Sequence, residues 1–164
     1  MVSETYVECL VARKSSFVIR LLRTLLIMLT VCCFIVGLMD IRSLIAAIVL
    51  GVASYFVYMN ADIEYEYLYL DKEIKIDKVL AKSKRKKVVT YDIGRMEILA
   101  PVKSYHLDAF RNRELKSVDY SSGTDEDGKK YMMVYEGNQK VIWEPSAEMV
   151  KAIQMVAPRK VFTD

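Results

Sequence analysis

The sequence predicts an α+β protein in which a hairpin of two transmembrane helices precedes a seven-stranded antiparallel barrel with a C-terminal capping helix. Three observations lead to this prediction. Two long apolar stretches follow each other near the N-terminus, short segments of alternating apolar residues begin after residue 61, and one amphipathic segment lies near the C-terminus. These patterns are typical of membrane-spanning helices, of strands with one buried face and of a surface helix, respectively.

The first apolar stretch covers residues 24–39 and the second covers residues 43–61, which contain 16 and 19 uncharged residues. A helix needs about twenty apolar residues to cross the ~30 Å hydrocarbon layer of a membrane. The first stretch reaches this length if Arg20 and Arg23 extend their side chains to the lipid headgroups. We therefore expect a transmembrane hairpin in residues 17–61, with spans at 17–39 and 42–60. Because no small-residue cleavage site follows the first stretch, we do not expect it to be a cleaved signal peptide.

Positive charges lie on the same side of both spans. Arg42 is the only cation between the two apolar stretches. Other cations precede the first stretch or follow the second, namely Arg13, Lys14, Arg20, Arg23, Lys72, Lys75 and Lys78. Loops that are rich in Lys and Arg remain in the cytoplasm. The sequence thus predicts a multi-pass protein of the cell membrane with both termini in the cytoplasm.

Residues 1–16 contain apolar side chains at helical spacing, with Tyr6 and Val7 followed by Leu10 and Val11. We expect these residues to form a cytoplasmic amphipathic segment, a short helix lying on the inner membrane surface.

The second span carries a stripe of small residues that would allow another helix to approach closely, namely Ser43, Ala47, Gly51 and Ser54. Two interpretations remain open. The stripe can pack against the first span of the same chain, or it can support self-association into a homo-oligomer.

Residues 62–164 form the predicted cytoplasmic domain. Their alternating pattern and intervening turn residues predict strands at residues 62–70, 74–80, 85–91, 95–100, 116–121, 130–136 and 139–144. Residues 101–115 are less regular, with a short helical turn expected around 107–113. Pro145 and Ser146 then open a helix at residues 147–156. Seven antiparallel strands followed by one helix is the order of a pleckstrin-homology-like (PH-like) barrel.

The chain also resembles a small family of bacterial two-pass membrane proteins of unknown function with a C-terminal PH-like domain. The resemblance rests on the two-span hairpin, on the opening residues 6–14, and on the later segments 65–70, 74–80 and 88–93. It implies a fold and a location, and it supplies no site residues.

The densest group of charges comprises five cations within six residues, namely Lys82, Lys84, Arg85, Lys86 and Lys87. Near an anionic membrane surface, each cation can contribute about 1 kcal/mol to binding. A lipid-binding turn is therefore one interpretation. The alternative is a solvated strand edge on which lysines prevent aggregation.

Other classes of function find no support in the composition. Residues 62–164 contain 19 Lys and Arg against 18 Asp and Glu, so we expect no nucleic-acid partner. His106 is the only histidine and no catalytic set or glycine-rich phosphate loop is present, so we expect no enzyme, metal or cofactor. The segment Asp125 to Gly128 lacks the other ligands of a calcium loop, and we interpret it as a turn.

The leading hypothesis is a non-enzymatic, membrane-anchored PH-like interaction or scaffold module at the inner face of the cytoplasmic membrane. Its partners would be membrane lipid and an unidentified membrane or cytoplasmic protein. The alternative hypothesis is a sensor of anionic lipid surfaces that uses the basic turn at residues 82–87.

Overall fold

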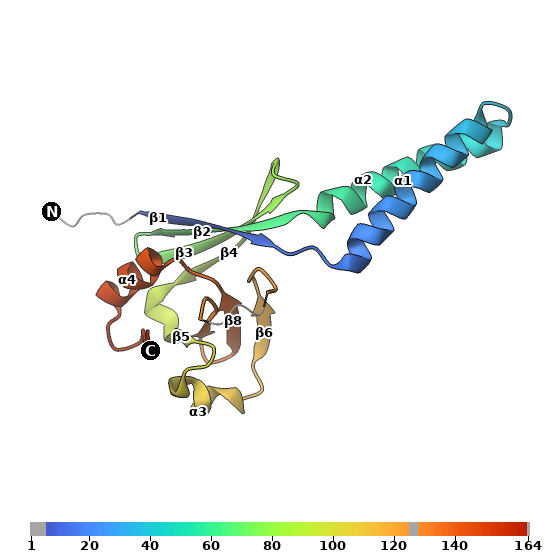
Figure 1. Ribbon diagram of the computed structural model, residues 1–164. Helices are drawn as coiled ribbons and strands as arrows, with labels where there is room; N and C mark the ends of the chain where they lie inside the picture. The colour runs from blue at the N-terminus through green and yellow to red at the C-terminus, as the bar shows by residue number, and fades with distance from the viewer. Residues whose placement is uncertain (1–5, 125–127, 164) are drawn as a thin grey trace.

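The computed structural model describes residues 6–124 and 128–163, and two long helices dominate its outline (Figure 1). Helix α1 (Phe17–Gly37) and helix α2 (Ile41–Ala61) lie side by side and project away from a two-sheet domain. Both helices have 21 residues and are long and apolar enough to cross a membrane. Asp40 begins α2, because its carboxylate accepts a hydrogen bond from the Ser43 N–H.

The first sheet, here sheet A, consists of four antiparallel strands in the order β1-β2-β3-β4. Their bounds are β1 (Val7–Arg13), β2 (Ile63–Leu70), β3 (Glu73–Leu80) and β4 (Lys84–Asp92). The helix pair is inserted between β1 and β2, which pair along their full length from Val7 opposite Tyr69 to Arg13 opposite Ile63. The helices therefore leave the domain from two neighbouring strands.

Strand β1 corrects the prediction of a helix within residues 1–16. Val7, Cys9 and Val11 alternate toward the core, with Glu8 and Leu10 exposed between them. In so short a segment the same apolar residues fit both helical and strand spacing. Pairing with β2 decides between them, and this pairing is invisible to a local pattern. Residues 1–5 lie outside the described residues.

The second sheet, sheet B, has the order β5-β7-β8-β6. Its strands are β5 (Met96–Pro101), β6 (Lys116–Asp119), β7 (Tyr131–Tyr135) and β8 (Gln139–Trp143). Strand β6 runs parallel to β8, whereas the other pairs are antiparallel. The predicted barrel of seven antiparallel strands is therefore wrong in detail. The described residues form eight strands in two separate sheets without a closed barrel. Strand β1 is an additional strand of sheet A, and β6 is a parallel edge strand of sheet B.

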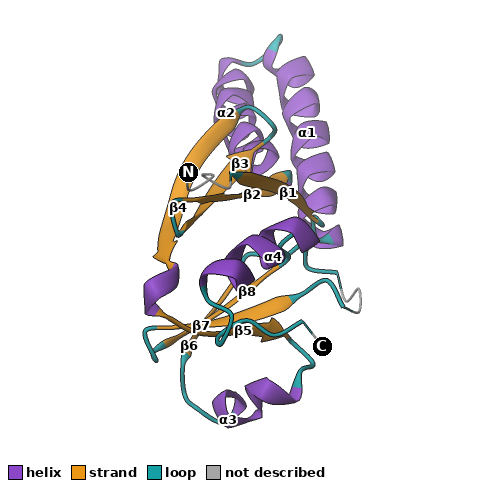
Figure 2. Ribbon diagram, turned by 90° about the vertical axis from the view of Figure 1, so that its left-hand side faces the viewer, coloured by secondary structure: helices purple, strands orange, loops and turns teal. Residues whose placement is uncertain are grey.

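Helix α4 (Ala147–Val156) coincides with the predicted C-terminal helix. Its N-terminus is capped by the Ser146 hydroxyl, which accepts a hydrogen bond from the Met149 N–H at 3.2 Å. Figure 2 shows sheet A between the helix pair and sheet B, with α4 beside the two sheets. The expected turn near residue 107 contains two short helices, η2 (Tyr105–Leu107) and α3 (Asp108–Arg111).

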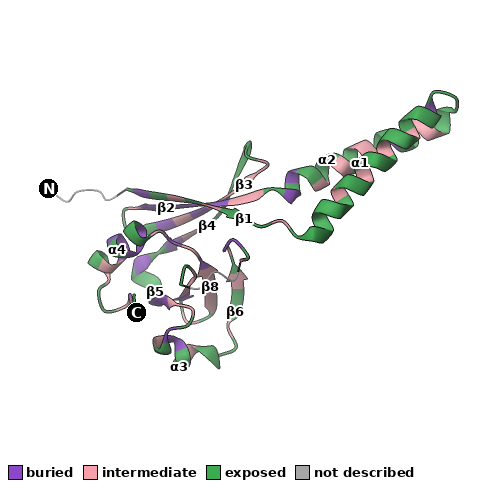
Figure 3. Ribbon diagram, viewed as in Figure 1, coloured by how far each residue is buried: buried purple, intermediate pink, exposed green. Residues whose placement is uncertain are grey.

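The main core lies between the sheets and α4. Tyr67, Trp143 and Ile153 are fully buried within it, and the Tyr67 and Trp143 rings meet edge to face at 5.3 Å. Burial is concentrated in this domain, whereas α1 and α2 are largely exposed (Figure 3). The domain is therefore a folded unit, and within residues 6–124 and 128–163 no other part of the chain covers the apolar surface of the helix pair.

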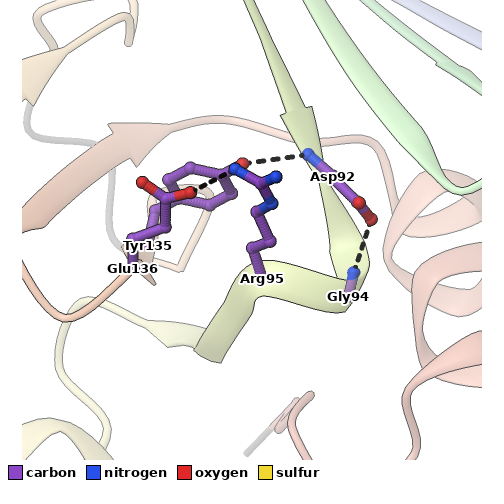
Figure 4. Close-up of polar contacts among 5 residues, drawn as sticks. All are labelled: Asp92, Gly94, Arg95, Tyr135 and Glu136. Carbon is purple, nitrogen blue, oxygen red and sulfur yellow. Dashed lines mark hydrogen bonds and ion pairs between the residues drawn. The ribbon is translucent and has the colours of Figure 1, made fainter.

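A polar corner joins the two sheets where β4 passes through η1 (Ile93–Arg95) into β5 (Figure 4). The Asp92 carboxylate accepts a hydrogen bond from the Gly94 N–H at 2.8 Å, and the Asp92 N–H donates to the Tyr135 hydroxyl at 3.4 Å. The Arg95 guanidinium contacts the Glu136 carboxylate at 2.7 Å. These contacts connect the end of sheet A to the β7–β8 turn of sheet B.

Candidate functional site

The five predicted lipid-binding cations lie in the β3–β4 turn and at the start of β4, and all five are exposed. The turn is tight, because the Ser83 N–H donates to the Leu80 carbonyl at 3.1 Å. Ala81 and Lys82 adopt the left-handed conformation, with φ values of 46° and 55°. Such pairs form the type I′ turns that favour Asn and Gly, so this turn is strained.

The basic turn lies at the base of the helix pair. The Ala81 N–H donates to the carbonyl of Asp62 at 2.8 Å, and Asp62 directly follows α2. The tip of the β3–β4 hairpin accordingly lies beside the end of α2 in both views (Figures 1 and 2). From α1, the Arg23 guanidinium lies 5.2 Å from the centre of the Tyr58 ring and 3.9 Å from the Asp62 carboxylate. Cations from two elements thus gather where the helices meet the domain.

Successive residues of a strand point to opposite faces of a sheet, so the basic run divides into two sets. The inner face of sheet A points toward the core, and the outer face points away from it. Arg85 lies on the outer face, where its guanidinium contacts the Glu66 carboxylate at 2.6 Å. Lys87 shares that face, because it is the register partner of Asp77, which is itself the partner of Glu66. Lys84 and Lys86 lie on the inner face.

The outer face carries a small hollow of about 170 Å³. The residues around it come from the chain before β1 and from all four strands of sheet A, namely Tyr6, Glu8, Glu66, Leu68, Asp77 and Arg85. Glu66 is only 5% exposed at the bottom of this cluster. The Tyr6 hydroxyl donates to Glu8 at 2.8 Å, so an acidic network surrounds the single arginine.

Burial raises the pKa of Glu66 above its ordinary value, and its hydrogen bond with Glu8 raises it further. The same bond lowers the pKa of Glu8, as expected for a pair of carboxyl groups that shares a proton. Arg85 opposes the rise in the Glu66 pKa. Arg85 is therefore the internal counter-ion of a buried carboxyl group.

The inner face presents cations with a different environment. Lys86 lies directly opposite Lys78, and Lys84 lies opposite Leu80. Among the described residues, no carboxylate lies within 4.0 Å of the ammonium group of Lys78, Lys84 or Lys86. Arg13 approaches from β1 on the same face and donates to the Tyr65 hydroxyl at 3.0 Å.

The predicted stripe of small residues lies mainly against α1. Ala47 is 5% exposed, and a side chain at Gly51 would meet the Thr30 methyl group at 3.8 Å. Ser54 is half-buried on the same side of α2, whereas Ser43 takes part in the Asp40 cap. The buried and half-buried positions of α1 recur at alternating spacings of three and four residues, at 23, 26, 30, 33 and 37. This spacing is typical of two helices packed through a coiled-coil-like seam.

The remaining sequence candidates are possible metal ligands, His106 and the acidic turn near residue 125. No group of three His, Cys, Asp or Glu side chains within residues 6–124 and 128–163 could hold a metal ion. His106 stacks on the Phe162 ring at a centroid distance of 3.8 Å. Asp125, Glu126 and Asp127, part of the expected turn, lie outside the described residues.

A comparison with protein families adds to this geometry. The model of the family described as bacterial PH-like domain (DUF6106) matches residues 3–163. The chain belongs to this family. The bacterial PH-like match extends over β1, the helix pair and both sheets, so the helices lie inside the matched region. No curated protein and no solved structure matches the chain.

Sequence reasoning missed three residues that shape this bacterial PH-like domain at the base of the helices. The helix expected within residues 1–16 includes Arg13, Lys78 enters the prediction only as a charge near the membrane, and the sequence pattern indicates no partner for Glu66. The alternation of β2 and β3 signals on which face Glu66 and Lys78 lie. Only the strand register shows which residues they meet.

Proposed function

We propose that this protein is a non-enzymatic, membrane-anchored interaction or scaffold module. In this proposal α1 and α2 cross the cytoplasmic membrane, and the PH-like domain lies at its inner face. Family membership supports a PH-like domain, a class that is generally non-catalytic. The proposal depends most on the helix pair, whose apolar surface is not covered by any other described part of the chain.

The seam between α1 and α2 uses small residues, so the large apolar side chains point outward. Examples are Leu25, Phe34 and Phe56, which are 57%, 55% and 62% exposed. The core helix of a soluble protein would bury such side chains, yet none of the most apolar window of α1 is buried. A hydrocarbon environment explains both features, since association of helices in lipid relies on close backbone approach through small residues.

A labelling experiment tests the topology. Met39 in the α1–α2 turn is 95% exposed, and Met155 on α4 is 80% exposed. In full-length protein without its native cysteines, Met39→Cys should react with an impermeant maleimide on intact cells. Met155→Cys should react only after the membrane is permeabilised. If Met155→Cys is labelled on intact cells, the proposed topology is wrong. If alkaline carbonate extracts the protein from membranes, the proposed anchor is wrong.

The scaffold role is tested on three surfaces of the full-length chain. A photo-crosslinking amino acid can replace Leu10, Val88 or Tyr105, which are 55%, 40% and 68% exposed. A scaffold should give an adduct of one defined mass from one face and none from the other two. If all three positions give no adduct in growing cells, the interaction role is contradicted.

The second candidate function is contact with anionic lipid through Lys82, Lys84, Arg85, Lys86 and Lys87. The hydrogen bond between Ala81 and Asp62 favours it, because it holds the basic turn where α2 ends. In non-ionic detergent, phosphatidylglycerol should raise the unfolding temperature of the full-length protein more than phosphatidylcholine does. High salt should reduce the difference, since screening weakens charge interactions. Equal effects of the two lipids would contradict this function.

A further inference from the structure

We propose that the inner face of sheet A, beside the helix pair, binds the phosphate of an anionic phospholipid through Arg13, Lys78, Lys84 and Lys86. This site rests on the second candidate function and makes it specific. The whole basic run would not contact lipid in the same way, because Arg85 and Lys87 face away from the site.

The four cations occupy two neighbouring rows of paired residues. Arg13, Ile63, Leu80 and Lys84 form the row next to α2, and Val11, Tyr65, Lys78 and Lys86 form the next row on the same face. Two residues along a strand correspond to about 7 Å. The headgroup layer on one side of a membrane is about 5–8 Å thick. Both rows therefore fall within reach of lipid phosphates if α2 ends at the membrane boundary.

The arrangement of charges indicates an anion. Lys78 and Lys86 are direct cross-strand partners, and like charges in this position destabilise a sheet. The outer face is different, since Lys87 is paired in register with Asp77 and Arg85 contacts Glu66. A bound phosphate would relieve the repulsion on the inner face only.

Arg13 gives the site a defined geometry. Its Nη1 donates to the Tyr65 hydroxyl at 3.0 Å, which holds the guanidinium near the ring of a core tyrosine. A guanidinium has five N–H donors, so this bond leaves others available for phosphate oxygens. The lysine ammonium groups on β3 and β4 would supply charge from the opposite side of Tyr65.

The test uses full-length protein in a non-ionic detergent and a soluble short-chain phosphatidylglycerol, with binding followed by titration calorimetry. One variant carries Lys84→Gln and Lys86→Gln on the inner face. Its control, the outer-face variant, carries Lys82→Gln in the turn and Lys87→Gln on the outer face, which removes the same charge close to the end of α2 and leaves the contact between Arg85 and Glu66 intact. Thermal unfolding of each variant establishes that it is folded.

We expect the inner-face variant to weaken phosphatidylglycerol binding roughly 30-fold, from two cations at the usual contribution of each. The outer-face variant should bind nearly as well as the wild type. If both variants weaken binding equally, the lipid contact stands as a diffuse patch and the proposed site is wrong. If the wild type does not bind phosphatidylglycerol, both the site and the second candidate function fail. Inorganic phosphate that binds as tightly as the lipid would overturn the assignment to a membrane ligand.

Discussion

Buried tyrosines make the stability of the domain sensitive to alkaline pH. Burial raises the pKa of Tyr67 and of Tyr91 well above 10, and the Tyr67 hydroxyl donates to the Tyr120 carbonyl at 2.6 Å. In the unfolded chain both residues ionise near pH 10, whereas in the folded chain they keep their protons. Their contribution to stability is therefore complete below pH 10 and is lost as the pH rises further.

We expect the free energy of unfolding to fall above pH 10, by up to about 1.4 kcal/mol per pH unit for each tyrosine. Tyr91→Phe removes one ionisation and should reduce this slope. Urea unfolding followed by the fluorescence of Trp143 measures it, because Trp143 is the single tryptophan and is fully buried. Tyr105→Phe is the control, since Tyr105 is 68% exposed. Equal slopes for Tyr91→Phe and the wild type would contradict the prediction.

The strain in the basic turn leads to a second prediction, which concerns the stability effect of a single substitution. Ala81 has a φ of 46°, in the left-handed region that glycine occupies without strain. Ala81→Gly should stabilise the protein by about 1 kcal/mol, which thermal or urea unfolding in detergent can measure. Gly123→Ala is the reverse control, because Gly123 has a φ of 77° and open space around its Cα, so it should destabilise through strain alone. A loss of stability in Ala81→Gly would show that the turn is not strained.

At the scale of elements, the two glycines of the helix pair have different tolerances. A Cβ at Gly37 would lie 2.8 Å from the backbone nitrogen of Leu44, whereas a Cβ at Gly51 would meet the Thr30 methyl group at 3.8 Å. Gly37→Ala should therefore push the ends of α1 and α2 apart, and Gly51→Ala should be accepted. A cross-link through position 51 is impossible in Gly51→Ala. Thermal unfolding in detergent therefore measures the stability of both variants.

We expect Gly37→Ala to cost roughly 1–3 kcal/mol through overpacking, and Gly51→Ala to change stability by less than about 0.5 kcal/mol. Equal effects would mean that the helices do not pack through this seam.

Local patterns predicted the later elements well. The strand at residues 74–80 and the helix at residues 147–156 were recognisable because turn residues bound them and their apolar residues follow one period. Strand β1 was missed because its partner β2 lies beyond both apolar helices. The parallel pairing of β6 with β8 depends on contacts that leave no trace in the local pattern.

The candidate site shows the same limit. The run at residues 82–87 was visible as a concentration of charge, and its place beside a strand turn was expected. Its division between two faces depends on the β3–β4 register, and the approach of Arg13 depends on the position of β1. A contiguous basic run thus becomes two separate environments only in the folded sheet.

At the scale of the whole molecule, the domain boundary is the most useful correction. A chain that begins at residue 62, the predicted domain boundary, would omit β1 and expose the edge of β2. Because Arg13 lies directly opposite Ile63, residues 14–62 can instead be replaced by a two-residue Asn-Gly turn that closes β1 and β2 into a hairpin. We expect this shortened protein to be soluble and folded.

The measurement is a comparison of the two shortened proteins by circular dichroism and urea unfolding, with Trp143 as the fluorescent reporter. The version with the Asn-Gly turn should unfold cooperatively, and the version that starts at residue 62 should aggregate or unfold without a transition. Cooperative unfolding of both versions would show that β1 is dispensable.

The insertion of the helices between paired strands also determines the order of events during synthesis. Strand β1 leaves the ribosome first, but its partner follows about 50 residues later, after both apolar helices. At ordinary rates of translation this delay is roughly 3–10 s. Throughout that interval sheet A lacks its first pairing, so the domain can complete its fold only after α1 and α2 have been synthesised.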